Sequence, residues 1–198
     1  MLKARFSIVV ALGTAVVLGL TLLLWLQGPE RHADGAGPLA SLNRPGSEAM
    51  KAQPTSGVTS WTYGLRLCLA TGSAPAILES VSPTVSVGTG YRFLGAGVRE
   101  WLPTQTHSPI ISVSAWPPPV EQVPDSIRAV RGFAVSTPCS DGAHDRYTEL
   151  LIGLGLVNAD GGGWQGLEIS YQVSGRHRVV AIDKVFEICG GSVACGPP

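Results

Sequence analysis

The sequence predicts an all-β protein, an antiparallel β-sandwich of about seven to nine strands preceded by one N-terminal transmembrane helix. Three observations support this prediction. From Trp61 onward, short runs alternate apolar with polar residues and are bounded by Gly, Pro, Ser or Asp. The 198 residues include 25 glycines and 15 prolines, which favour turns over long helices. An uncharged apolar run near the N-terminus, before Trp61, predicts the transmembrane helix.

That apolar run, residues 6–26, is 21 residues long and would span roughly 31 Å as a helix, which matches the hydrocarbon core of a bilayer. Signal peptides have shorter apolar cores, and residues 33–37 offer only a weak cleavage site, so we expect an uncleaved anchor with cleavage as the alternative. Lys3 and Arg5 precede the run. The positive-inside rule therefore predicts a single-pass cell-membrane protein with residues 1–5 in the cytoplasm and the C-terminal domain outside.

Residues 27–57 are rich in Gly, Pro, Ala and polar residues and have neither a helical nor a strand period. Such a composition buries too little apolar surface to offset chain entropy. We therefore expect a flexible linker over 27–57 and an extracytoplasmic β-sandwich domain over 58–198.

Period-two alternation predicts eight strands in this domain. They lie near residues 62–69, 76–82, 91–99, 110–116, 132–136, 147–157, 166–173 and 178–188.

The most secure local prediction is the last hairpin. In "GLEISYQV", residues 166–173, Leu167, Ile169 and Tyr171 should face the core, while the residues between them face solvent. "SGRH", residues 174–177, should then turn the chain into the final strand. "NADGGG", residues 158–163, should likewise be a turn, since Gly, Asn and Asp tolerate positive φ.

All four cysteines follow the apolar run. In an oxidising compartment they indicate two disulfides, with three possible connectivities. We expect Cys139 to pair with Cys189 and Cys68 with Cys195, and a loop closed by Cys189 and Cys195 is the main alternative. No C-x-x-C pair is present, which argues against a zinc site.

The stretch "TPCSDGAHDRYTELL", residues 137–151, gathers Asp141, His144 and Asp145, whose oxygen and nitrogen atoms could bind a metal ion. The alternating acidic spacing of a calcium loop is absent. We therefore expect a polar turn before a strand, with no metal and no cofactor. These three residues remain weak ligand-binding candidates.

Trp164 is another weak candidate. It lies within the glycine-rich turn region of residues 158–166, so we expect it to be exposed, where it could stack on a sugar. Tryptophan in a small β-domain more often fills the core.

Several functions are disfavoured. The formal net charge is zero and there is neither a basic-aromatic stripe nor a phosphate-binding Gly-Lys loop, so nucleic-acid or nucleotide binding is not expected. "GGSVA", residues 190–194, only faintly matches a nucleophile elbow and lacks later acid and His partners. We expect no catalytic residues. A five-residue cytoplasmic tail also disfavours a transmembrane anti-sigma regulator.

The last 60 residues resemble small, uncharacterised, membrane-anchored extracellular proteins of high-GC Gram-positive bacteria of actinobacterial type. The matching residues are Tyr171 and Gly175 in a "v-x-Y-x-x-x-G" pattern, followed by a strand that ends in Cys189. The resemblance implies an immunoglobulin-like sandwich and no activity. Val173 stands where an immunoglobulin domain would have a cysteine, so the usual disulfide between the sheets is not expected.

Two functions remain. We expect a non-enzymatic interaction or accessory module of the cell envelope, whose partners are the membrane and another envelope protein or a cell-wall glycan. The alternative is an envelope carbohydrate-binding protein or hydrolase that uses Glu168, Asp141, His144 or Trp164.

Overall fold

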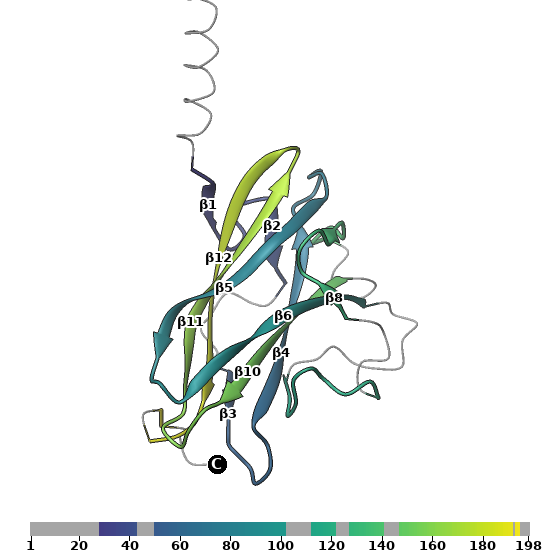
Figure 1. Cartoon of the computed structure of the whole chain (residues 1–198). Coiled ribbons are helices and arrows are strands. Elements are labelled where there is room, and N and C mark those ends of the chain that lie inside the picture. The colour runs from purple at the N-terminus through teal and green to yellow at the C-terminus, as the bar shows by residue number, and fades with distance from the viewer. Residues whose placement is uncertain are drawn as a thin grey trace, which may run out of the picture. The chain divides into compact units, whose positions relative to one another are not determined.

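Two packed β-sheets form a sandwich (Figure 1). The structure, a computed structural model, describes residues 28–42, 50–101, 112–121, 127–140, 147–191 and 193–194. The chain divides into two compact units, Met1–Glu30 and Arg31–Pro198, and the sandwich belongs to the second. The predicted all-β, two-sheet architecture is confirmed.

The first sheet has the strand order β1-β12-β11-β5-β9, with β3 also paired to β12. The pairs β12–β11, β11–β5 and β5–β9 are antiparallel, and β3 runs parallel to β12. The strands are β1 (Glu30–Ala33), β3 (Met50–Ala52), β5 (Ala76–Val87), β9 (Ala134–Val135), β11 (Gly162–Val173) and β12 (Arg176–Ile188).

The second sheet has the order β2-β4-β10-β6-β8, with β7 also paired to β4. Its pairs are antiparallel. The strands are β2 (Leu39–Ser41), β4 (Ser60–Leu69), β6 (Tyr91–Trp101), β7 (Ser112–Val113), β8 (Arg128–Ala129) and β10 (Tyr147–Leu156).

The hairpin of β11 and β12 confirms the sequence prediction. Leu167, Ile169 and Tyr171 are fully buried, and the residues between them are partly exposed. Ser174 and Gly175 both adopt positive φ between the paired ends of the two strands, as a tight two-residue turn requires.

Trp164 lies at the centre of the core, so its expected exposure is wrong. Its side chain is 0% exposed and packs against Phe186, Phe93 and Tyr91 at ring-centroid distances of 5.4, 5.8 and 6.0 Å. The reason is that β11 begins at Gly162, four residues earlier than predicted. Trp164 is thereby part of the strand, and it fills the space between the sheets.

The strand β10 is buried on both faces, because every residue from Tyr147 to Gly155 is buried. Leu150, Ile152 and Leu154 belong to the core between the sheets. On the opposite face Leu151 packs against three partly buried side chains of the segment that covers this sheet: Val113, Trp116 and Ile127. The second sheet therefore has hydrophobic contacts on both sides.

Three short strands lie within the segment expected to be a linker. β1 and β3 pair with β12, β2 pairs with β4, and Leu39 and Ala52 join the core. The Asp34 carboxylate accepts a hydrogen bond of 2.7 Å from the backbone N–H of Ser41, which fixes the turn between β1 and β2. The linker expectation is wrong for these described residues, because edge pairing orders a sequence that has no period of its own.

The disulfide joins Cys68 in β4 to Cys139, with the two Cα atoms 4.8 Å apart. The expected pairing of Cys139 with Cys189 and of Cys68 with Cys195 is therefore wrong. A parallel bridge between Leu69 and Pro138 brings the two bonded cysteines side by side. Cys189 is also disulfide-bonded, and Cys195 lies outside the described residues.

In the part of the chain that the structure describes, no helix is long and apolar enough to span a membrane. The span predicted from the sequence, residues 6–26, lies outside that part.

Replacement of Gly153 tests the packing on the outer face of β10. A Cβ added at Gly153 would overlap the indole ring of Trp116, whereas one added at Gly28 would meet nothing within 4 Å. We expect Gly153→Ala to lower the free energy of unfolding by about 1–3 kcal/mol and Gly28→Ala to leave it nearly unchanged. Denaturant titration measures both, and equal stabilities would contradict the packing described.

The Cys68–Cys139 disulfide closes a loop across a sequence separation of 71 residues. Loop-closure entropy predicts that replacing both cysteines with alanine lowers stability by about 4 kcal/mol. Urea unfolding of the natural protein and of the double variant, both without reductant, checks this. An unchanged unfolding midpoint in the double variant would contradict the expectation.

Candidate functional site

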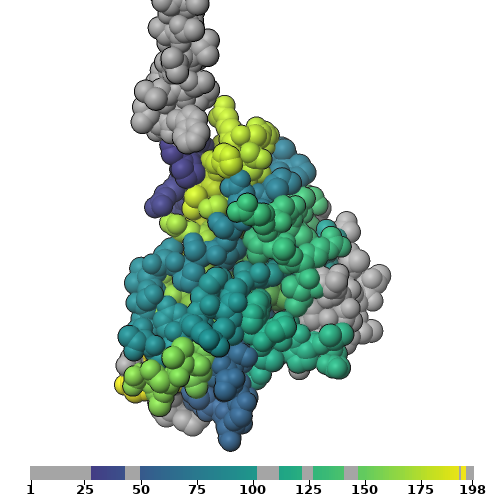
Figure 2. Space-filling model, in the orientation of Figure 1, coloured from purple at the N-terminus to yellow at the C-terminus, as the bar shows by residue number. Residues whose placement is uncertain are grey.

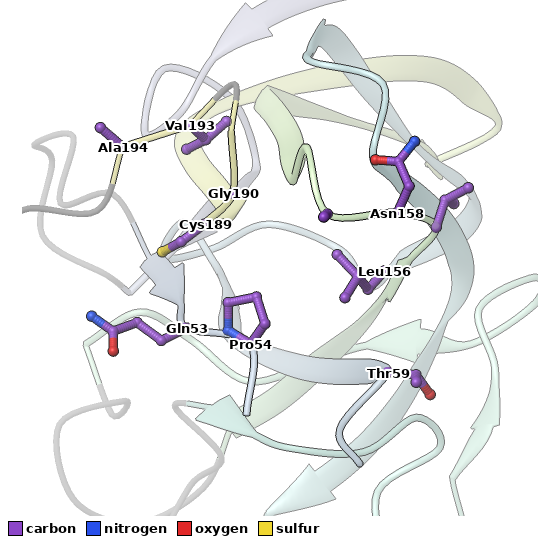
Figure 3. A pocket seen from close by; sticks show the side chains of 11 residues that line it. Gln53, Pro54, Thr59, Leu156, Asn158, Cys189, Gly190, Val193 and Ala194 are labelled. Carbon is purple, nitrogen blue, oxygen red and sulfur yellow. The ribbon is translucent and has the colours of Figure 1, made fainter. Parts of the chain in front are cut away.

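An open pocket of about 780 Å³ lies at one end of the sandwich (Figure 3). This volume is within the range of roughly 300–1,000 Å³ typical of ligand sites. Its lining comes from the chain after β3, from the end of β10 and from the chain after β12. The residues are Gln53, Pro54, Thr59, Leu156, Val157, Asn158, Ala159, Cys189, Gly190, Val193 and Ala194.

Backbone hydrogen bonds hold these segments together. Gly90 donates to the Gly161 carbonyl at 2.8 Å, and Gly191 donates to the Ala159 carbonyl at 3.0 Å. The turn after β10 is thus tied both to the start of β6 and to the chain after β12. The pocket wall is therefore built into the sandwich.

The "NADGGG" turn shapes one wall. Its Asn158 side chain accepts a hydrogen bond of 2.9 Å from the backbone N–H of Asp160. Gly161 has a φ of +67°, and a Cβ there would overlap the carbonyl oxygen of Ile188. Glycine is required on both counts, because the turn lies directly against the end of β12. The sequence prediction of a turn is confirmed for 158–161, and the last two glycines belong to β11.

Among the described residues, no charged side chain lines the pocket. Pro54, Leu156 and Val193 supply apolar surface, and Gln53 and Asn158 supply amides. In Figure 3 Pro54 and Leu156 lie across from the chain at Cys189 and Gly190. This combination suits an uncharged ligand that carries both an apolar group and hydrogen-bonding groups, because burying an unpaired charge there would be costly.

A charged pair that is not part of the lining holds the chain after β12 in place. The Lys51 ammonium donates to the Ala194 carbonyl at 3.0 Å and lies 3.3 Å from the Glu187 carboxylate. This contact links β3, β12 and the chain that follows β12. It orients the wall and leaves the lining uncharged.

Of the sequence-predicted candidates, the two that the structure describes, Trp164 and Glu168, do not line this pocket. Trp164 is buried in the core and is not part of the lining. Asp141, His144 and Asp145 lie outside the described residues. Glu168 is opposite Ser82 and Ala181 in the first sheet and lies 3.4 Å from Arg31. Among the described residues, no three His, Cys, Asp or Glu side chains gather as a metal site would require.

Sequence reasoning missed a buried ion pair on the outer face of the second sheet. Arg99 Nε lies 2.6 Å from Glu149 Oε2, and the two side chains are 1% and 0% exposed. The strand register places Glu149 directly between Arg99 on β6 and Arg66 on β4. Charged residues inside two otherwise apolar strand patterns, "FLGAGVREW" and "YTELLIGLGL", were the signal that could have revealed it.

Tyr147 lies beside this row of charged side chains. Its ring stacks on Trp101 at 5.0 Å, and the Arg66 guanidinium lies 5.5 Å from the ring centroid. Burial raises the pKa of Tyr147 well above its usual value, and the Glu149 carboxylate raises it further, while Arg66 and Arg99 oppose that rise. The phenol is therefore neutral. The cluster does not line the pocket, and we interpret it as structural.

Glu149→Gln tests that interpretation, because it leaves Arg99 buried without a charged partner. We expect stability to fall by about 3–5 kcal/mol, with ligand binding by the folded fraction unchanged. Glu79→Gln, which disrupts the partly exposed pair with His177 at 2.9 Å, is the matched control and should cost less than about 1 kcal/mol. Thermal unfolding measures both, and equal effects would contradict a structural role for the buried pair.

Comparisons with known proteins return no match: no family model, no curated protein and no solved structure is similar to this chain. The resemblance of the last 60 residues therefore rests on those residues alone. At the coarser level, the chain is an all-β protein of two packed sheets.

Proposed function

We propose that this protein is a non-enzymatic, membrane-anchored interaction module of the cell envelope and that it binds its partner at the pocket beyond β12. The apolar run at residues 6–26 supports the anchor. The disulfide of Cys68 and Cys139 supports an oxidising, extracytoplasmic compartment, since such bonds are rare in the cytosol.

The position of the pocket along β12 carries the proposal. The chain enters the sandwich beside the middle of β12, where the Asp34 backbone donates to the Ala181 carbonyl at 3.0 Å. The pocket begins eight residues further along, at Cys189. At about 3.3 Å per strand residue this separation is about 26 Å. A domain held at its N-terminal end would thus present the pocket away from its point of attachment.

The lining defines the kind of partner. An uncharged wall with two amides complements an uncharged segment of another envelope protein better than a charged polymer. A carbohydrate ligand is less well supported, because Trp164, the residue expected to stack on a sugar, is in the core.

Site-specific photo-crosslinking in intact cells tests this function. A photoreactive residue at Val157, which lines the pocket and is 57% exposed, should form a discrete adduct. The same residue at Val120, which is 74% exposed and does not line the pocket, is the matched control and should not. Adducts from both positions alike, or from neither, would contradict binding at the pocket.

A charge placed in the wall gives the corresponding affinity test. Val157→Glu should lower the affinity for the partner captured at this site at least about tenfold, since the carboxylate would lose its solvation on binding. Val120→Glu should leave the affinity unchanged.

Protease digestion of intact spheroplasts tests the compartment separately, because a protease added outside the cell cleaves an extracytoplasmic domain without lysis.

A further inference from the structure

Very little chain separates the proposed membrane span from the sandwich. The apolar run ends at Leu26, and β1 begins at Glu30. The chain from Leu26 to Glu30 reaches at most about 14 Å, at roughly 3.6 Å per residue. The headgroup layer on one side of a bilayer is itself about 5–7 Å thick. A domain anchored through residues 6–26 is therefore held at the membrane surface, whereas a flexible linker over 27–57 would let it move away.

The chain enters the sandwich from the end at which β12 begins. Arg178 Nη1 lies 2.9 Å from His32 Nε2, and the Asp34 N–H donates to the Ala181 carbonyl at 3.0 Å. From His32 to Asp34 the chain thus runs in the same direction as β12. The end that carries the turn at 174–175 is consequently the one nearest to the anchor.

A hollow of about 480 Å³ lies at this end of the sandwich. Ala134 of β9 lines it and is opposite Ile77 of β5, which is opposite Gln172 of β11. Gln172 is in turn opposite His177, the second residue of β12. In Figure 2 the green surface of the chain between β8 and β9 lies near the yellow-green surface of the β11–β12 hairpin. The lining of the hollow includes Glu100, Arg128, Arg131 and Phe133.

The segment that forms the hollow is attached to both sheets. Arg128 is opposite Val98 in β6, and the Phe133 carbonyl accepts a hydrogen bond of 2.8 Å from the Leu78 N–H in β5. The Phe133 side chain belongs to the core, and the Arg128 guanidinium lies 5.9 Å from its ring centroid. The shape of the hollow is therefore set by contacts with the two sheets.

The arginines at this end have no acidic partner. Among the described residues, no ion pair involves Arg128, Arg131 or Arg176, and all three are exposed. Arg176 begins β12 at the tip of the hairpin. Against these three cations, the lining of the hollow supplies one carboxylate, that of Glu100. The hollow and the hairpin tip together carry net positive charge, although the formal net charge of the chain is zero.

We propose that this end of the sandwich rests on the membrane surface and that the hollow binds the phosphate of an anionic lipid headgroup between Arg128 and Arg131. Guanidinium groups bind phosphate through charge-assisted hydrogen bonds, often two at once. Each arginine near an anionic bilayer surface raises the ratio of docked to undocked forms about fivefold. The short connection to the anchor also keeps the local concentration of headgroups high.

This inference rests on the proposed membrane anchor and is independent of any partner at the pocket beyond β12. That pocket begins at Cys189, about 40 Å along β12 from the level of His177. A domain docked through the hollow would hold the pocket away from the membrane.

The test uses the full chain reconstituted into vesicles of phosphatidylcholine, with or without phosphatidylglycerol. A photoreactive residue at Ala134, which is exposed and lines the hollow, should form many more lipid adducts when phosphatidylglycerol is present. The same residue at Val157, at the opposite end of the sandwich, should form few adducts in either kind of vesicle.

Charge variants then test the two arginines. Arg128→Gln with Arg131→Gln should lower the adduct yield at Ala134 at least about fivefold, whereas Arg128→Lys with Arg131→Lys should retain most of it because the charges remain. Arg92→Gln is the matched control and should leave the yield unchanged. Arg92 is also exposed and without an ion pair, but it lies opposite Gly155 near the other end.

Inorganic phosphate distinguishes the headgroup from the free ion. At equal ionic strength, phosphate should lower the adduct yield no more than chloride does, because the anchor holds the hollow beside a high concentration of headgroups. A loss of adducts in phosphate alone would mean that the free ion is the preferred ligand, and it would contradict the inference.

A chain that does not float with the vesicles would overturn both the anchor and this inference. For a chain that floats, three results would overturn the inference alone. They are equal adduct yields from positions 134 and 157, a yield at 134 that does not depend on phosphatidylglycerol, and equal effects of the glutamine and lysine double variants. A failure to find a protein partner at the pocket would leave the inference standing.

Discussion

The burial of β10 on both faces is the constraint on which the rest of the structure depends. One face packs into the core between the sheets, and the other is covered by Trp116 and Ile127. A strand so placed must be apolar on both sides, which explains the nearly continuous hydrophobic run from Leu150 to Leu156. It must also carry glycine where the cover approaches most closely, at Gly153. The only charge on β10, at Glu149, is buried and therefore requires Arg99.

The same strand positions the candidate site. The end of β10 places Leu156 and Val157 at the end of the sandwich. There the turn at 158–161 is hydrogen-bonded to Gly90 and lies against the end of β12. The disulfide at Cys68 fixes a different part of the second sheet, beyond the register position of Thr148 and Leu67. The pocket is left as the open surface at the end of β10, where the proposed binding would take place.

The sequence predicted the long strands well because turn residues bound each one and several of them alternate apolar with polar residues, although β10 is apolar on both faces. It failed where order comes from distant partners. β1, β2 and β3 lie in a Gly- and Pro-rich segment with no period, and only their pairing with β12 and β4 orders them. Trp164 was expected in a loop because three glycines precede it, yet Gly163 is in the strand, where a side chain would overlap the Phe186 carbonyl. The pocket itself could not be predicted, since its walls meet only through tertiary contacts.

Native-state hydrogen exchange tests the central role of β10 most directly. The account predicts that the backbone amides of Leu150 to Leu154 exchange only through global unfolding, with protection equal to the full free energy of unfolding. The amide of Val81 on the edge of β5, which points away from β11, should exchange many times faster. Exchange of the β10 amides as fast as those of the β5 edge would contradict the account, because it would mean that β10 is not held on both faces.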